Sequence, residues 1–269
     1  MTADDALQIY HSMAQAIFSK DNKKFKGQDG LFKATTLKEK VQEVVSKEKL
    51  GELMFDSSRH PRKAKAFVCA VPANNMEYPR RFRTYEVRDN PSANCKIWEA
   101  ARATTAAPTF FKRIDIGQEQ FIDGGLRCNN PAKQVLEEAN KVFGNERLVS
   151  CLVSIGTGHS GTIGLENPDR FQKFLATKTI GVLKKIATDC EQTSNELHTR
   201  FQDVEKFYFR FNVEHGAETI SLEEWEKMGK LEEHTNAYKE KPSVSKAINE
   251  VVSRLCHPEN VRQTLGSLS

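Results

Sequence analysis

The residues of this chain best suited to catalysis are a carboxylate and two glycines, Asp123-Gly124-Gly125. The apolar pair Phe121-Ile122 directly before them predicts that the carboxylate lies at the end of a strand. Two residues without a Cβ allow a partner hydroxyl to approach this carboxylate closely, and glycine also permits a positive φ in the turn. We therefore predict that Asp123 acts as a base.

Three further motifs accompany this turn in a fixed order along the chain. They are the stretch from Ile97 to Phe111, in which small residues precede Pro-Thr-Phe-Phe, then Asn129-Asn130-Pro131, and then Ser154 to Gly158. A lone Asp-Gly-Gly triplet is most often an ordinary turn, but a motif gains weight from its surroundings. The four motifs together resemble patatin-like phospholipases, a family of serine lipid acyl hydrolases, and the resemblance extends to about Leu255.

The resemblance implies hydrolysis of ester bonds in phospholipids or other acyl lipids, without a metal or organic cofactor. In the family mechanism a serine oxygen attacks the acyl ester, the aspartate takes its proton and backbone amides hold the oxyanion. Asp123 matches that aspartate, and Gly124 and Gly125 match its motif. The family's Gly-x-Ser-x-Gly elbow and glycine-rich oxyanion loop, both upstream of the aspartate, do not occur in this chain. We therefore expect a C-terminal portion of the family domain that is inactive by itself.

Several alternatives to this interpretation stay open. Ser160 lies among glycines beside His159, but the residue two positions beyond it is Thr162 where an elbow needs glycine, so a plain loop is favoured. The chain could instead be a non-catalytic patatin-like module that binds lipid or a protein partner. Met1 could also be an internal start of a longer, complete enzyme, and the residues present do not separate truncation from natural loss.

The composition indicates one folded domain over residues 1–269. Hydrophobic residues make up 38% and charged residues 28% of the chain, within the range of globular proteins. The net charge of +4 gives little support to a nucleic-acid partner. The six cysteines are scattered without a Cys-x-x-Cys pair, which argues against a metal site and favours a reducing compartment. No apolar run approaches membrane-spanning length, so we expect a cytoplasmic protein whose membrane contact is peripheral.

Basic side chains gather in three stretches, at residues 20–26, 59–65 and 80–88. Solvated surface is the ordinary explanation of such clusters. Contact with an anionic lipid surface is the alternative, because clustered Lys and Arg are attracted to it. A lipid substrate makes this second explanation attractive.

The expected fold is a three-layer α/β/α patatin-like domain with a largely parallel central sheet, from which the N-terminal strands are missing. Apolar spacing predicts a helix over residues 2–19 capped by Thr2. The asparagines of Asn129-Asn130-Pro131 are predicted to cap a helix that ends near Gly144. The almost continuously apolar stretch 148–155 predicts a parallel strand covered on both faces.

Three more elements follow from the pattern of the later residues. Residues 168 to about 200 carry an apolar stripe at helical spacing, and residues 207–213 alternate as a strand does. Pro242 is predicted to open the last helix.

Overall fold

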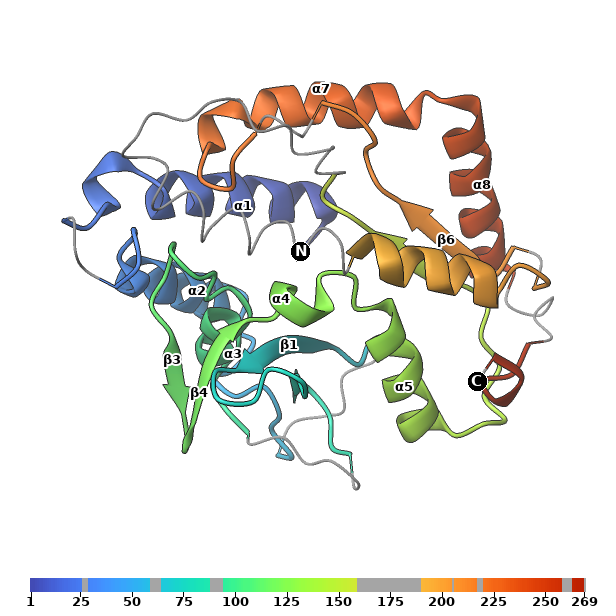
Figure 1. Ribbon diagram of the computed structural model, residues 1–269, viewed down its shortest axis with the longest axis horizontal. Helices are drawn as coiled ribbons and strands as arrows, with labels where there is room; N and C mark the ends of the chain where they lie inside the picture. Colours follow the sequence, from blue (N-terminus) through green and yellow to red (C-terminus); the bar gives the residue numbers. More distant parts are fainter. Residues whose placement is uncertain are drawn as a thin grey trace. The chain divides into compact units, whose positions relative to one another are not determined.

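The computed structural model shows a chain that forms two compact units of helices and strands (Figure 1). The described residues are 1–25, 29–58, 64–87, 94–158, 190–204, 206–216, 220–257 and 263–268. The first unit holds Met1–Cys128 and Leu222–Glu226, and the second unit holds the other described residues. The single domain over residues 1–269 stays a prediction.

The described residues of the first unit form four helices: α1 (Ala3–Ile17), α2 (Ala34–Lys47), α3 (Ile97–Thr104) and the short α4 (Gly125–Cys128). The start of α1 is fixed by a capping box, in which the Thr2 hydroxyl accepts from the Asp5 N–H and the Asp5 carboxylate accepts from the Thr2 N–H. The predicted helix with Thr2 as its cap is therefore confirmed. A 3₁₀ turn, η1 (Lys20–Asn22), follows it.

The first unit also contains a four-stranded sheet in the order β2-β1-β4-β3. Its strands are β1 (Phe67–Pro72), β2 (Arg80–Arg83), β3 (Ile114–Ile116) and β4 (Glu119–Asp123). All three pairings in this sheet are antiparallel. Between β3 and β4 only Gly117 and Gln118 intervene, and Gly117 has a φ of +63°, as a tight hairpin turn requires.

The predicted α/β class is confirmed, but this sheet differs from the largely parallel one that we expected. A connection of two residues can join only antiparallel strands, whereas parallel strands need a crossover of a dozen or more residues. Among the described residues, a parallel pair occurs only in the second unit, between β5 (Leu152–Ile155) and β6 (Tyr208–Phe211). The three-layer arrangement stays a prediction.

Helix α3 packs on the antiparallel sheet through small side chains. Ala100 and Ala103 are 1% and 0% exposed, and they share a core cluster with Ala70 of β1 and Phe121 of β4. Alanine at these positions lets the helix approach the strands closely. The small residues before Pro-Thr-Phe-Phe thus allow close packing of this helix against the sheet.

The second unit combines the β5–β6 pair with α5 (Ala132–Phe143), α7 (Met228–Lys239) and α8 (Pro242–Cys256). Residues 190–200 of this unit are also helical, and Gly266–Leu268 form the 3₁₀ turn η4. Another 3₁₀ turn, η2 (Trp225–Lys227), begins in the residues of the first unit and ends at Lys227 of the second. The predicted start of the last helix at Pro242 is confirmed. Of the predicted helix over 168 to about 200, residues 168–189 lie outside the described residues.

The strand predicted over 148–155 is parallel to its neighbour, as predicted, but the prediction that it is covered on both faces was wrong. The strand begins at Leu152, and only Leu152 and Ser154 are buried, whereas Ile155 is 78% exposed. An apolar run reports hydrophobicity but not how many neighbours cover a strand. Among the described helices, none is both long and apolar enough to cross a membrane.

The core contact between Phe82 and Phe121 provides a test of the packing in the first unit. Both side chains are 2% exposed, and their rings meet edge to face with centroids 5.2 Å apart. We expect Phe121→Ala to lower the free energy of unfolding by about 3–5 kcal/mol, because it leaves a cavity and loses the ring contact. Urea unfolding followed by circular dichroism measures this change.

Phe25→Ala is the matched control, because this phenylalanine belongs to the same unit and is 87% exposed. It should shift the free energy of unfolding by less than about 0.5 kcal/mol. Equal effects of the two substitutions would contradict the described core.

Candidate functional site

Asp123 is the last residue of β4, where its backbone pairs with Ala70 of β1. Gly124 forms the turn that follows, and Gly125 begins the short helix α4. The predicted position of the carboxylate at a strand end is thereby confirmed. Its action as a base stays a prediction.

Gly124 is required for close approach of two backbone segments and not for a positive φ. A Cβ built at this position would lie 2.0 Å from the carbonyl oxygen of Cys69 and 2.8 Å from its carbonyl carbon. Gly124 is not among the glycines with positive φ. Gly124 therefore accommodates the backbone of β1, and the approach of a partner hydroxyl to the Asp123 carboxylate stays a prediction.

The C-terminal end of α3 holds the turn in place through backbone and side-chain hydrogen bonds. The Thr104 hydroxyl donates to the carbonyl oxygen of Cys69 at 2.6 Å. The Gly124 N–H donates to the carbonyl oxygen of Thr104 at 3.3 Å, and the Asp123 N–H donates to that of Ala106 at 3.2 Å. The structure thus brings together two of the sequence motifs, the stretch from Ile97 to Phe111 and the Asp-Gly-Gly turn.

The carboxylate of Asp123 is held at one oxygen. Its Oδ1 accepts from the Gly125 N–H at 2.6 Å, and among the described residues no other hydrogen bond to the carboxylate is present. Burial raises the pKa of Asp123 to about 6, an effect that the Gly125 hydrogen bond partly opposes. A carboxylate with a raised pKa is a stronger base, and it is still ionised at neutral pH.

The segment after α3 contains a strained residue that the sequence did not reveal. Thr109 has a φ of +75°, which a β-branched residue rarely adopts. Its carbonyl oxygen accepts from the Leu31 N–H at 2.8 Å. Pro108 indicates a turn at this point in the sequence, but it does not indicate that φ of Thr109 is positive.

Arg102 fixes the same segment from within the protein. Its side chain is 3% exposed, and its Nη2 donates to the carbonyl oxygen of Lys112 at 2.8 Å. The guanidinium also lies 5.7 Å from the ring centroid of Phe111. Burial lowers the pKa of Arg102. Its residue type and neighbours in the sequence do not distinguish it from other arginines.

The other two motifs meet in the second unit. Asn130 is buried, and its Oδ1 accepts from the Ser154 hydroxyl at 3.0 Å and from the Ala132 N–H at 3.3 Å. The residue at the N-cap position of α5 is Pro131, which corrects the prediction that asparagine occupies it. Asn130 nevertheless bonds an amide of the first turn, and the helix ends before Gly144 as predicted.

The alternative nucleophile and the possibility of a metal site remain to be located. Ser160 lies outside the described residues. The histidine, cysteine and acidic side chains that the structure does describe form no group of three or more able to hold a metal ion.

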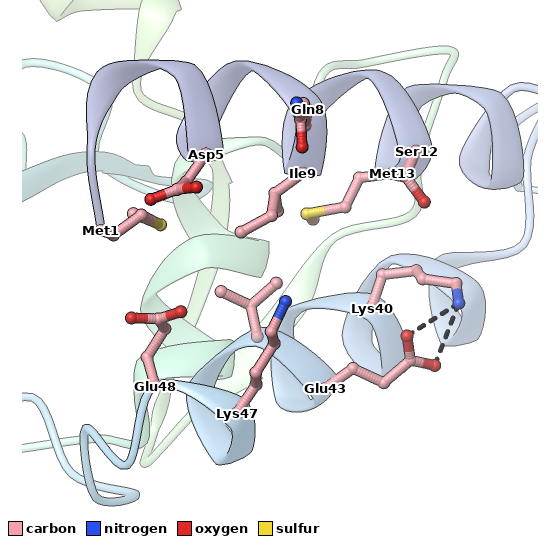
Figure 2. A pocket seen from close by; sticks show the side chains of 11 residues that line it. Met1, Asp5, Gln8, Ile9, Ser12, Met13, Lys40, Glu43, Lys47 and Glu48 are labelled. Carbon is pink, nitrogen blue, oxygen red and sulfur yellow. Dashed lines mark hydrogen bonds and ion pairs between the residues drawn. The ribbon is translucent and has the colours of Figure 1, made fainter.

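A groove of about 580 Å³ lies between α1 and α2 (Figure 2). Its walls include Ile9 and Met13, and at one end Lys40 pairs with Glu43 at 2.8 Å. Asp123 is not among the residues that line it. This groove is therefore separate from the carboxylate.

The comparisons with known proteins agree with the motifs. The model of the family "Patatin-like phospholipase" matches residues 2–136. Calcium-independent phospholipase A2-gamma of Mus musculus is 27% identical over 227 residues, which cover 79% of this chain and 28% of that protein. Patatin-like phospholipase 1 of Plasmodium falciparum is 30% identical over 182 residues, 56% of this chain and 26% of that protein. The chain thus spans only about a quarter of the length of these relatives.

Substitution of Gly124 tests the close approach to β1. We expect Gly124→Ala to destabilise the first unit by about 3 kcal/mol, because the added methyl group overlaps the Cys69 carbonyl and the backbone must move. Gly229→Ala in α7 is the control, since nothing lies within 4 Å of its Cβ position. The control should be neutral or stabilising by up to about 1 kcal/mol. A neutral Gly124→Ala, measured by urea unfolding, would refute the described turn.

The pH dependence of stability tests the burial of Asp123. Because burial raises its pKa to about 6, the folded protein holds a proton that the unfolded chain releases near pH 4. The free energy of unfolding therefore falls as pH rises from about 4 to 6 and levels off above that. Asparagine does not titrate in this range, so Asp123→Asn does not lose this stability. The free energy of unfolding of the variant minus that of the native chain should rise by about 2 kcal/mol from pH 4 to 7.

The direct measurement is a ¹³C NMR titration of the Asp123 carboxyl carbon, with a midpoint expected at about 6. The exposed Asp115 of β3 supplies the matched control variant, Asp115→Asn. Its stability should follow that of the native chain across the same pH range. A midpoint near 4 for Asp123 would show that the carboxylate is solvated.

Proposed function

The chain belongs to the patatin-like phospholipase family, and from this membership we propose that it supplies the aspartate of a Ser-Asp dyad that hydrolyses acyl lipid esters. Asp123 is the base that takes the proton of the attacking serine hydroxyl. The substrate is a phospholipid or another acyl lipid. The serine itself is not carried in an elbow of this chain, so the chain alone is inactive.

The observation that carries this proposal is the state of the Asp123 carboxylate. A general base works best when its pKa lies close to the pH at which it operates. Burial raises the pKa of Asp123 to about 6, and the hydrogen bond from Gly125 fixes one carboxylate oxygen. The second oxygen is therefore available to accept a hydrogen bond from a hydroxyl that approaches the strand end. A carboxylate that takes the proton of a serine nucleophile requires such an oxygen.

The names of the relatives support the substrate class and a chemistry that does not depend on calcium. They include calcium-independent phospholipases A2 and a patatin-like phospholipase. We extend their hydrolysis of phospholipids to this chain as part of the proposal. We also propose a cytoplasmic protein with peripheral membrane contact, because none of the described cysteines forms a disulfide, as in a reducing compartment.

A second candidate function is a non-catalytic lipid- or protein-binding module. The sequence feature that favours it is the lack of any Gly-x-Ser-x-Gly. Loss of one member of a jointly acting catalytic unit removes most of its rate, so a family member without the serine would retain only binding.

Labelling with a fluorophosphonate separates these functions, because such probes modify activated serines. The chain alone should show no adduct by intact mass and no hydrolysis of a soluble ester. A folded chimera that places the Gly-x-Ser-x-Gly segment of a patatin-like phospholipase before this chain should gain one adduct and ester hydrolysis. In the chimera, Asp123→Asn should lower kcat by about 10³- to 10⁴-fold.

Asp115→Asn in the same chimera is the control, because Asp115 is an exposed carboxylate of β3. It should leave kcat within about twofold of the parent chimera. An adduct on Ser160 of the chain alone would replace the proposed dyad with a different nucleophile. A chimera that hydrolyses esters equally well with Asp123→Asn would remove Asp123 from the mechanism.

A further inference from the structure

Phe25 is the most exposed of the large apolar side chains of the described residues, at 87%. It lies in the loop between α1 and α2, which we call the Phe25 loop (residues 20–25 and 29–33). Leu31 of the same loop is also exposed, at 41%. Two apolar side chains of one short loop therefore face water.

The ends of the Phe25 loop are firmly attached to the first unit. The Lys24 N–H donates to the carbonyl oxygen of Leu31 at 2.8 Å, and Lys23 and Phe32 form an antiparallel bridge. Phe32 is 0% exposed and packs edge to face on Phe18, with ring centroids 5.2 Å apart. The loop thus projects Phe25 from a buried aromatic anchor.

Asn22 strengthens this attachment from inside the loop. It is 5% exposed, its Nδ2 donates to the carbonyl oxygen of Ile17 at 2.5 Å, and its Oδ1 accepts from the Thr36 hydroxyl at 2.6 Å. The Lys33 N–H also donates to the carbonyl oxygen of Asn22 at 3.0 Å. The loop is consequently tied to both α1 and α2, and the exposure of Phe25 is not that of a loose terminus.

The positive charge of the Phe25 loop indicates which kind of surface the exposed Phe25 would contact. The loop as defined contains four lysines and two aspartates. Lys20 and Lys23 are exposed, as Phe25 is. A loop that exposes both an aromatic side chain and two lysines matches an anionic bilayer, where the ring enters the boundary between headgroups and acyl chains and the ammonium groups meet the headgroups.

We propose that the Phe25 loop docks the protein on anionic lipid membranes, with Phe25 inserted into the interface and Lys20 and Lys23 on the headgroups. This inference rests on the proposed function, because a lipid acyl hydrolase must reach substrate that resides in a bilayer. It adds the surface of the protein that makes the contact and the charge of the lipid that it prefers.

Co-sedimentation with vesicles tests the docking surface in the full chain. Binding should be stronger to phosphatidylcholine vesicles that contain roughly 30 mol% phosphatidylserine than to pure phosphatidylcholine, and salt should weaken it. Phe25→Ala should lower the partition coefficient by about tenfold on the anionic vesicles, because it removes the inserted ring. The pair Lys20→Gln and Lys23→Gln should lower it by about tenfold as well.

Phe143→Ala is the matched control, since this phenylalanine of α5 is 47% exposed and lies outside the Phe25 loop. It should leave the partition coefficient unchanged, and circular dichroism should show all variants folded. Absence of vesicle binding, or equal losses for Phe25→Ala and Phe143→Ala, overturns the proposal. Because binding is measured without turnover, its failure is distinguishable from a failure of ester hydrolysis.

Discussion

The close approach of Gly124 to the carbonyl oxygen of Cys69 is the constraint on which the candidate site depends. No side chain fits between these two backbone segments, since a Cβ would lie 2.0 Å from that oxygen. The same carbonyl oxygen accepts from the Thr104 hydroxyl, so β1, β4 and the end of α3 meet at one point. The position of the Asp123 carboxylate follows from this junction.

The segment that leaves α3 connects this junction with a second feature of the first unit. Its beginning supports the Asp-Gly-Gly turn through the carbonyl oxygens of Thr104 and Ala106. Its end places Phe110 and Phe111 in the aromatic cluster that also contains Phe32. One stretch of chain thus positions the proposed base and anchors the loop that presents Phe25.

The chemistry of Asp123 is set by its surroundings in the first unit. Burial raises its pKa, and the two neighbours that fix it in place are a backbone carbonyl and a backbone amide. These interactions need no serine. A buried carboxylate with a raised pKa and a missing Gly-x-Ser-x-Gly can therefore coexist in one chain.

Local sequence signals determined the features that depend on neighbouring residues, namely the Thr2 capping box, the Pro242 helix start and the strand end at Asp123. Motif order identified the patatin-like phospholipase family. Only the tertiary structure decided the antiparallel pairing of β1 with β4 and the shift in the pKa of Asp123. Strand direction and burial arise from contacts between segments distant in sequence, and residue type and spacing do not encode these contacts.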